Sequence, residues 1–178
     1  MTAPHLPTAL AVLAVVALLL VLYRWRTRPQ GFISVGDQAT YETLHTASLA
    51  ARHLADGLTD DGCSKAAPYL RALVATPALA ICDHGSVITW DGEGSHHLPA
   101  VVDQAGPALT AGRTVVLGPD EVTCASTDCP VRSAVIAPIQ LESGVVGALA
   151  AYGPRTSAGM TRAVEELAGW VATQVELA

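Results

Sequence analysis

The segment SAVIAPIQLESGVVGALAAY, residues 133–152, decides the fold that we expect for this chain. Two apolar runs, 133–141 and 145–152, flank the short stretch Glu142-Ser143-Gly144. Apolar runs of this length around a polar, glycine-containing connection are typical of a β-hairpin. We therefore expect two adjacent antiparallel strands in the second half of the chain.

Three further short strands are predicted upstream, at 78–82, 87–90 and 114–117. The first two flank the turn-forming stretch Asp83-His84-Gly85-Ser86 and predict a second hairpin. Helical patterns cover 37–56, 68–75, 99–109 and 157–178, with Asp37 as a candidate N-cap and Pro68 in the first turn of its helix. This order predicts an α+β domain with about five mostly antiparallel strands flanked by helices.

The helices predicted before and after the strands carry apolar seams at heptad spacing. The first seam steps by three and four residues through Leu44, Ala47, Ala51, Leu54 and Leu58, and the last continues through Met160, Val164, Leu167, Val171 and Val175. Such a seam packs either on its own domain or against a second copy of the chain in a dimer. The sequence leaves both alternatives open. The terminal helix, 157–178, is a candidate output helix because no capping signal ends its pattern.

The first 28 residues differ in composition from the rest. Residues 6–23 are an apolar run of about 27 Å as a helix, close to the thickness of a bilayer core. Tyr23 and Trp25 follow as interfacial aromatic residues, and Arg24, Arg26 and Arg28 follow as positive charges. We expect 1–28 to be a single-pass membrane anchor, 29–36 a linker and 37–178 a cytoplasmic domain. A cleaved signal peptide and a buried helix are the alternatives for the first segment.

Charge and composition narrow the classes of function. The chain carries a net charge of −6, and all 16 acidic residues but only seven of the ten basic residues follow Arg28, which leaves −9 on that part. This argues against a nucleic-acid partner. The four cysteines are too few for a disulfide scaffold. Aromatic residues make up only 4% of the chain, which argues against stacking of a large aromatic cofactor, and no cofactor is expected.

Three local motifs, taken with the order of elements, resemble a known family. They are GSHHLP at 94–99, CASTDCP at 124–130 before the strand that begins SAVIAP, and GVVG at 144–147. As a set they resemble the cytoplasmic GAF module of LytS-type sensor histidine kinases over about residues 37–178. The resemblance implies a dimeric membrane sensor in two-component signalling, with a histidine kinase domain in cis or in trans and a response regulator as partner. The sequence differs from that family in having one span and no recognisable kinase region, so no catalytic residue is assigned.

Cys124 and Cys129 are the first candidates for a binding site. They could contact a small ligand in the GAF cavity, form a reversible thiol pair, or pack as small apolar side chains beside Pro130. Zinc is a further alternative in which His96 and His97 would complete the ligand set. Adjacent histidines on a strand point to opposite faces, so a shared ion would require a loop there. No metal is assigned on the sequence alone.

Arg132, Ser133 and Arg113 complete the candidate ligand-binding residues. An arginine beside a hydroxyl and a thiol suits a small carboxylate or another anion. The alternative is that both arginines pair with surface carboxylates. His96 and His97 are included as ligand contacts, with loop stabilisation and a pH response as alternatives.

We therefore expect a membrane-anchored GAF sensor module that binds a small, anionic metabolite and signals through dimer helices. A GAF scaffold with an empty cavity is one alternative. A cysteine-dependent GAF-fold methionine sulfoxide reductase is another, which would require a nucleophilic and a resolving cysteine.

Overall fold

The computed structural model describes residues 6–26 and 35–177, and side chains within 14–24 and 40–177. The chain divides into two compact units, 1–39 and 40–178. The first contains helix α1, Leu6–Arg26, and its described large apolar side chains from Val15 to Tyr23 are 46–67% exposed. None of the helices, searched over the described residues, meets the length and hydropathy that crossing a bilayer requires. Most of the predicted linker 29–36 lies outside the described residues.

A five-stranded antiparallel sheet forms the centre of the second unit, with the spatial order β2-β1-β5-β4-β3. The strands are β1 (Ala78–Cys82), β2 (Val87–Gly92), β3 (Val115–Leu117), β4 (Ser133–Leu141) and β5 (Gly144–Gly153). Both predicted hairpins are present: β1 pairs with β2, and β4 pairs with β5. The predicted α+β class with five strands is confirmed.

Side chains of the central strands alternate between two separate cores. Along β1, Leu79 and Ile81 join one core while Ala78, Ala80 and Cys82 join the other. In β5, Leu149 and Ala151 face the first core, whereas Ala150 and Tyr152 face the second. This is the two-residue period of a strand that is buried on both faces.

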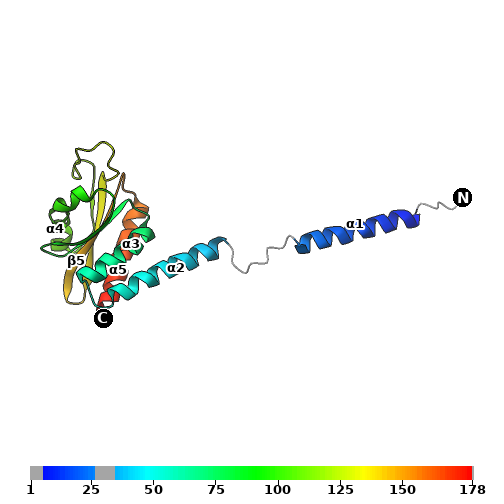
Figure 1. The fold of residues 1–178 in the computed structure, drawn as a ribbon, viewed down its shortest axis with the longest axis horizontal. Helices are drawn as coiled ribbons and strands as arrows, with labels where there is room; N and C mark the ends of the chain where they lie inside the picture. Colours follow the sequence, from blue (N-terminus) through cyan, green and yellow to red (C-terminus); the bar gives the residue numbers. More distant parts are fainter. Residues whose placement is uncertain (1–5, 27–34, 178) are drawn as a thin grey trace. The chain divides into compact units, whose positions relative to one another are not determined.

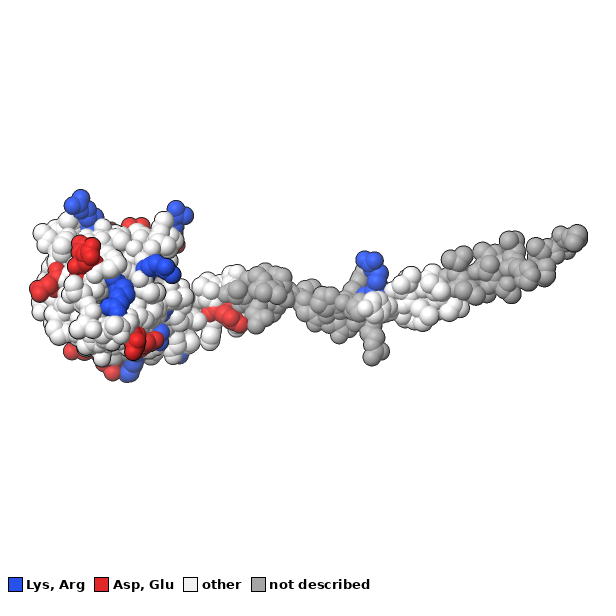
Figure 2. Space-filling model, turned by 90° about the horizontal axis from the view of Figure 1, so that it is seen from above, with Lys and Arg blue, Asp and Glu red and all other residues white. Residues whose placement is uncertain are grey.

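Helices cover both faces of the sheet (Figure 1). Helices α2 (Val35–Leu54), α3 (Asp60–Val74) and α5 (Ala158–Glu176) supply the first core, and α4 (Val101–Ala111) supplies the second. Charged side chains of both signs are interspersed over the face of the domain shown in Figure 2. Because the helices cover the faces of the sheet, the loops lie at the ends of its strands.

The start of α3 differs from the sequence-based prediction. The helix begins at Asp60 instead of residue 68, because the Thr59 side chain accepts a hydrogen bond from the Gly62 N–H and caps the first turn. Asp60 and Asp61 add negative charge at the N-terminus, where the helix dipole favours it. Pro68 therefore lies in the interior of the helix.

The predicted starts of two other helices also differ from the observed ones. Helix α2 begins at Val35, so Asp37 lies in its first turn and does not precede it. The helix predicted at 99–109 is α4, which begins at Val101 directly after an unpredicted 3₁₀ helix, η1 (Ser95–Ala100). This 3₁₀ segment carries the paired histidines.

Candidate functional site

Four of the predicted site residues converge at one end of the sheet. His96 and His97 lie in η1, and Cys124 and Cys129 lie in the loop 118–132 between β3 and β4. One nitrogen or sulfur atom from each lies within 4.8 Å of the corresponding atom of every other. We call these four residues the His/Cys cluster. Loop 118–132, yellow-green in Figure 1, connects the edge strand β3 to its neighbour β4 at that end.

The 3₁₀ geometry of η1 brings the adjacent histidines to one side. Gly94 precedes the helix with a φ of +75°, and its carbonyl accepts the His97 N–H at 2.9 Å. Neighbouring residues of a 3₁₀ helix are rotated by about 120°, less than on a strand. The ring centroids of His96 and His97 are 4.5 Å apart. The two histidines therefore lie outside any strand, as binding of both to one ion would require.

Each histidine of the cluster lies against one cysteine. Nε2 of His96 is 3.1 Å from Sγ of Cys124, and Nε2 of His97 is 3.5 Å from Sγ of Cys129. His97 and Cys129 are buried, at 5% and 8% exposed, whereas His96 is exposed and Cys124 is half-buried. The cluster therefore has an inner pair and an outer pair, and solvent reaches the outer pair.

The two cysteines differ in acidity for this reason. The hydrogen bond with His96 lowers the pKa of the Cys124 thiol, and burial raises the pKa of the Cys129 thiol. Burial also lowers the pKa of His97, with the nearby positive groups of His96 and Arg132 acting in the same direction. The outer cysteine is the more readily ionised of the two.

Backbone groups act on both sulfur atoms. The Val131 N–H approaches Sγ of Cys129 at 3.4 Å, and the backbone at Ser126 contributes to the lowered pKa of the Cys124 thiol. In both cases the backbone group belongs to the residue two positions after the cysteine. Amide donors at this position stabilise a thiolate, because the N–H dipole points at the negative sulfur.

Arg132 is half-buried and hydrogen-bonds to the backbone of the loop. Its guanidinium donates to the carbonyl oxygens of Cys124 at 3.2 Å, Thr127 at 3.0 Å and Ser126 at 2.5 Å. Three backbone acceptors in one short segment match the fork geometry of a guanidinium. The side chain predicted to bind an anion thus orders the segment that carries Cys124, and it adds a positive charge beside the cluster.

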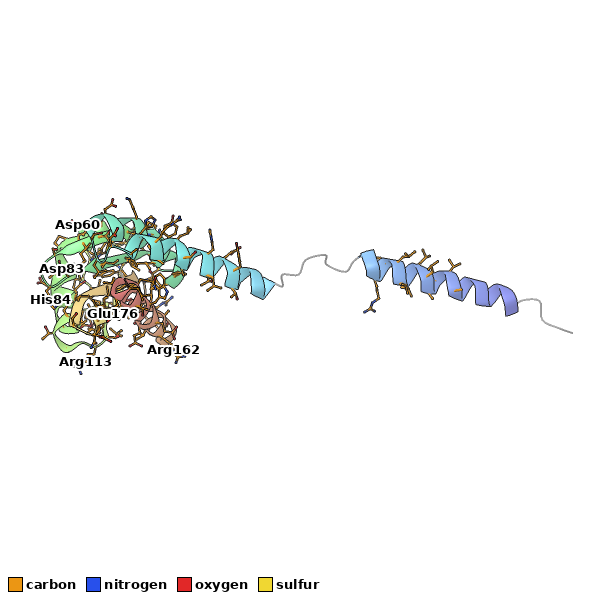
Figure 3. All side chains as sticks on the ribbon, turned by 90° about the horizontal axis from the view of Figure 1, so that it is seen from below. Asp60, Asp83, His84, Arg113, Arg162 and Glu176 are labelled. Carbon is orange, nitrogen blue, oxygen red and sulfur yellow. The ribbon has the colours of Figure 1, made fainter. Side chains whose placement is uncertain are left out.

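The remaining predicted site residues, Ser133 and Arg113, are not members of the cluster. Ser133 is buried and its hydroxyl donates to the Gly153 carbonyl at 3.1 Å, beside the Arg132 N–H, which reaches the same oxygen at 2.9 Å. Arg113 is exposed at the domain edge (Figure 3). Its neighbour Gly112 lies against Gln140 and Val145, toward the far end of β4 and β5 from Ser133. The structure does not bring Arg113 to the other candidates.

Two contributors to the site were not selected from the sequence. Gly94 lies so close to the cluster that a Cβ there would be 2.9 Å from Cγ2 of Val131 and 3.4 Å from Sγ of Cys129. A glycine two positions before His96 was a readable signal for this close approach. Val131 acts through its backbone N–H, which residue type does not reveal.

Comparison with known proteins places this fold and site in a family. The family model described as GAF domain matches residues 42–178, so the chain belongs to the GAF domain family. It is related to the LytS sensor histidine kinases. It is 26% identical over 161 residues to the sensor protein LytS of Bacillus subtilis, covering 83% of this chain and 27% of that protein. It is 25% identical over 146 residues to the sensor histidine kinase/phosphatase LytS of Staphylococcus aureus, covering 78% of this chain and 25% of that one.

Solved structures share the fold at low sequence identity. The GAF domain of the Acinetobacter phosphoenolpyruvate-protein phosphotransferase superposes with a TM-score of 0.55 at 10% identity, covering 76% of this chain and 93% of that domain. The free methionine-R-sulfoxide reductase of Neisseria meningitidis superposes with a TM-score of 0.53 at 16% identity, covering 82% and 94%. These similarities show the fold. The chain spans about a quarter of the length of the LytS proteins that it matches.

Proposed function

We propose that this chain is the membrane-anchored, cytoplasmic GAF sensor module of a two-component system. In this proposal it binds a small anionic metabolite and works as a homodimer. It passes the signal through helices to a histidine kinase domain, in cis or in trans, that acts on a response regulator. Its membership of the GAF family and its relation to LytS sensor kinases support a signalling role.

The observation that carries this proposal is the shared core of the entry and exit helices. Ala50 and Leu54 of α2 and Val164 and Leu167 of α5 belong to one buried cluster on one face of the sheet. Close-packed interiors transmit displacement instead of absorbing it. A shift of the sheet therefore acts on both helices together.

Exposed apolar surface on α2 supports a dimer. Tyr41 and Leu44 are 68% and 66% exposed in the described chain. Beside them, α2, α3 and α5 line an open groove of about 260 Å³, whose walls include Ala47, Leu73 and Trp170. Contact between two copies of α2 would remove this apolar surface from water.

The proposal of a membrane anchor rests on the sequence of α1. Residues 6–23 are apolar and are followed by three arginines, which favours placement of the following domain in the cytoplasm. The large exposed apolar side chains between Val15 and Tyr23 would be stable in hydrocarbon and costly in water.

A carboxylate is the first ligand class to test. Arg132 supplies a positive charge beside Cys124, in a domain whose net charge is negative. Two of the guanidinium's five N–H groups remain beyond the three donated to carbonyls, and these could meet an anion.

The experiment uses the full chain in lipid nanodiscs. Calorimetry with a panel of small carboxylates is expected to give saturable heat with at least one of them. Arg132→Ala is expected to weaken that binding more than tenfold, whereas Arg113→Ala should leave it unchanged.

Disulfide crosslinking of the Leu44→Cys variant tests the dimer and is expected to give crosslinked dimers.

Three results would contradict the proposal. The first is absence of heat with every carboxylate, which would favour a scaffold with no ligand. The second is a chain that is extracted from membranes by salt alone. The third is thioredoxin-coupled turnover of free methionine sulfoxide, which would favour a reductase.

A further inference from the structure

We infer that the His/Cys cluster is a binding site for a thiophilic divalent cation, with Zn²⁺ as the ion that it fits best. His96 and His97 would supply two imidazole nitrogens, and Cys124 and Cys129 would supply two thiolates. The inference is independent of the proposed sensor role, because it concerns what the four side chains bind and not what the domain signals.

The interatomic distances match a tetrahedral ion of this kind. With Zn–S bonds of about 2.3 Å and Zn–N bonds of about 2.0 Å, a tetrahedral site separates a sulfur from a nitrogen by about 3.5 Å. The two nitrogen–sulfur distances in the cluster are 3.1 Å for His96–Cys124 and 3.5 Å for His97–Cys129. All four donor atoms lie within 4.8 Å of one another. Shifts of the donor atoms by up to about 1 Å, through small side-chain rotations, would bring them to the distances of a tetrahedral site.

The donor set selects the class of ion. Two sulfurs and two imidazole nitrogens suit Zn²⁺ and other borderline or soft ions, whereas Mg²⁺ and Ca²⁺ require oxygen ligands. No carboxylate belongs to the group of four. Two thiolates also neutralise the charge of a divalent ion, which lowers the cost of placing it beside the buried His97 and Cys129.

Backbone groups beside both sulfur atoms favour the thiolate forms that bind a metal ion. The Val131 N–H donates to Sγ of Cys129 at 3.4 Å, and the backbone at Ser126 contributes to the lowered pKa of Cys124. Such donors orient ligating atoms and hold them in place. Arg132 fixes the carbonyls of Cys124, Ser126 and Thr127, so the segment between the two cysteines is shaped before an ion binds.

Four protein ligands leave no open coordination position, which is typical of a structural and not of a catalytic ion. The ion would join η1 to loop 118–132. His96 and Cys124 are 28 residues apart in the chain, and His97 and Cys129 are 32 residues apart. Because the ligand geometry is not present in the unfolded chain, the free energy of binding adds to the stability of this end of the domain.

The test uses the full chain in detergent micelles, reduced and stripped of metal by a chelator. Titration with Zn²⁺ is expected to saturate at one ion per chain and to release roughly two protons from the thiols near neutral pH. Co²⁺ in place of Zn²⁺ is expected to give the intense visible bands of tetrahedral cobalt and a near-ultraviolet sulfur-to-cobalt charge-transfer band. Excess Zn²⁺ should abolish both.

Matched variants separate the cluster from the other histidines and cysteines. Cys124→Ser and His96→Asn, both at the solvent-facing side of the cluster, are expected to weaken Zn²⁺ binding by more than about a hundredfold, since even a lost outer-shell partner costs 10–100-fold. Cys63→Ala in α3 and His45→Asn in α2 are expected to leave affinity and stoichiometry unchanged. Circular dichroism of each metal-free variant checks that it is folded.

The inference is overturned if the folded, reduced wild-type chain takes up less than one equivalent of Zn²⁺ at micromolar concentrations. It is also overturned if cobalt gives only the weak bands of octahedral coordination, or if the two control variants weaken binding as much as Cys124→Ser does. Carboxylate binding to the metal-free chain tests the proposed sensor function, whereas Zn²⁺ and Co²⁺ binding test the metal site. Failure of one proposal can therefore be distinguished from failure of the other.

Discussion

Nε2 of His96 lies 3.1 Å from Sγ of Cys124, although the two residues are 28 positions apart in the chain. The contact joins a 3₁₀ helix that follows β2 to a loop that precedes β4. These strands are separated in the sheet by β1 and β5, so the contact spans its end. It makes the outer cysteine the more acidic of the cluster pair.

Thiol reactivity should follow this arrangement in the reduced, metal-free chain. Cys124 has a lowered pKa because of the His96 hydrogen bond, whereas burial raises the pKa of Cys63 and of Cys82 to about 11. A lowered pKa gives more thiolate at a fixed pH and faster alkylation, and a raised pKa gives less. Peptide mapping after iodoacetamide treatment at pH 7.5 is expected to show Cys124 modified first.

The control for this prediction is His96→Asn, which removes the hydrogen bond that lowers the pKa and is expected to slow the modification of Cys124. Cys63 and Cys82 should react only after a denaturant is added. Labelling of either at the rate of Cys124 in the folded chain would contradict the assignment.

Gly94→Ala should destabilise the domain strongly. The residue has a φ of +75°, and an added Cβ would lie 2.9 Å from Val131 Cγ2. Backbone strain of about 1–2 kcal/mol and crowding of about 1–3 kcal/mol together predict a loss of about 2–5 kcal/mol in the free energy of unfolding. Urea denaturation followed by circular dichroism measures it.

Gly57→Ala separates the two contributions in the same assay. Its φ is +84°, but no atom lies within 4 Å of an added Cβ. Only the strain of about 1–2 kcal/mol is expected there. Equal losses for both variants would show that crowding against Val131 and Cys129 is unimportant.

Arg132→Lys should loosen the segment between the two cysteines. A lysine ammonium lacks the planar fork that reaches the carbonyls of Cys124, Ser126 and Thr127 together. Limited proteolysis is expected to cut the variant within 124–128 at least about tenfold faster than wild type, which corresponds to about 1.4 kcal/mol of lost local stability. Arg113→Lys, at an exposed site, is the control. Equal cleavage rates for the two variants would argue that the Arg132 hydrogen bonds do not order this segment.

Tyr152→Phe should cost about 0.5–1.5 kcal/mol of unfolding free energy. The Tyr152 hydroxyl donates to Oε1 of Gln104 at 3.0 Å and ties β5 to α4. The ring is fully buried and lies 5.0 Å from the ring of Trp90, so the aromatic packing survives the substitution. A double-mutant cycle with Gln104→Ala measures the coupling, and a coupling of zero would mean that the hydrogen bond does not contribute.

The strands were predictable because their signals are local. The connections Asp83-Ser86 and Glu142-Gly144 each lie between apolar runs, and those runs form hairpins β1–β2 and β4–β5. Helix α3 was placed too late because Pro68 resembles a first-turn residue, whereas the actual start depends on the Thr59 cap. A proline within the helix was the less expected of the two patterns.

The site was predictable as residue types but not as an arrangement. Histidine and cysteine are recognisable as ligands, so His96, His97, Cys124 and Cys129 could be selected from the sequence. Their convergence depends on the 3₁₀ turn after Gly94 and on contacts across 28 and 32 residues. Arg132 was selected as an anion binder, yet its three described acceptors are backbone carbonyls, and every residue has one of these.

The carbonyl oxygen of Gly153 accepts both the Arg132 N–H and the Ser133 hydroxyl. Gly153 is the last residue of β5, and only four residues separate it from the first residue of α5. The residue that clamps the cysteine loop is therefore hydrogen-bonded to the strand end that leads directly into the C-terminal helix. One oxygen atom thereby connects the cysteine loop to the residues that lead into α5, so a displacement of either segment acts on a hydrogen bond that both share.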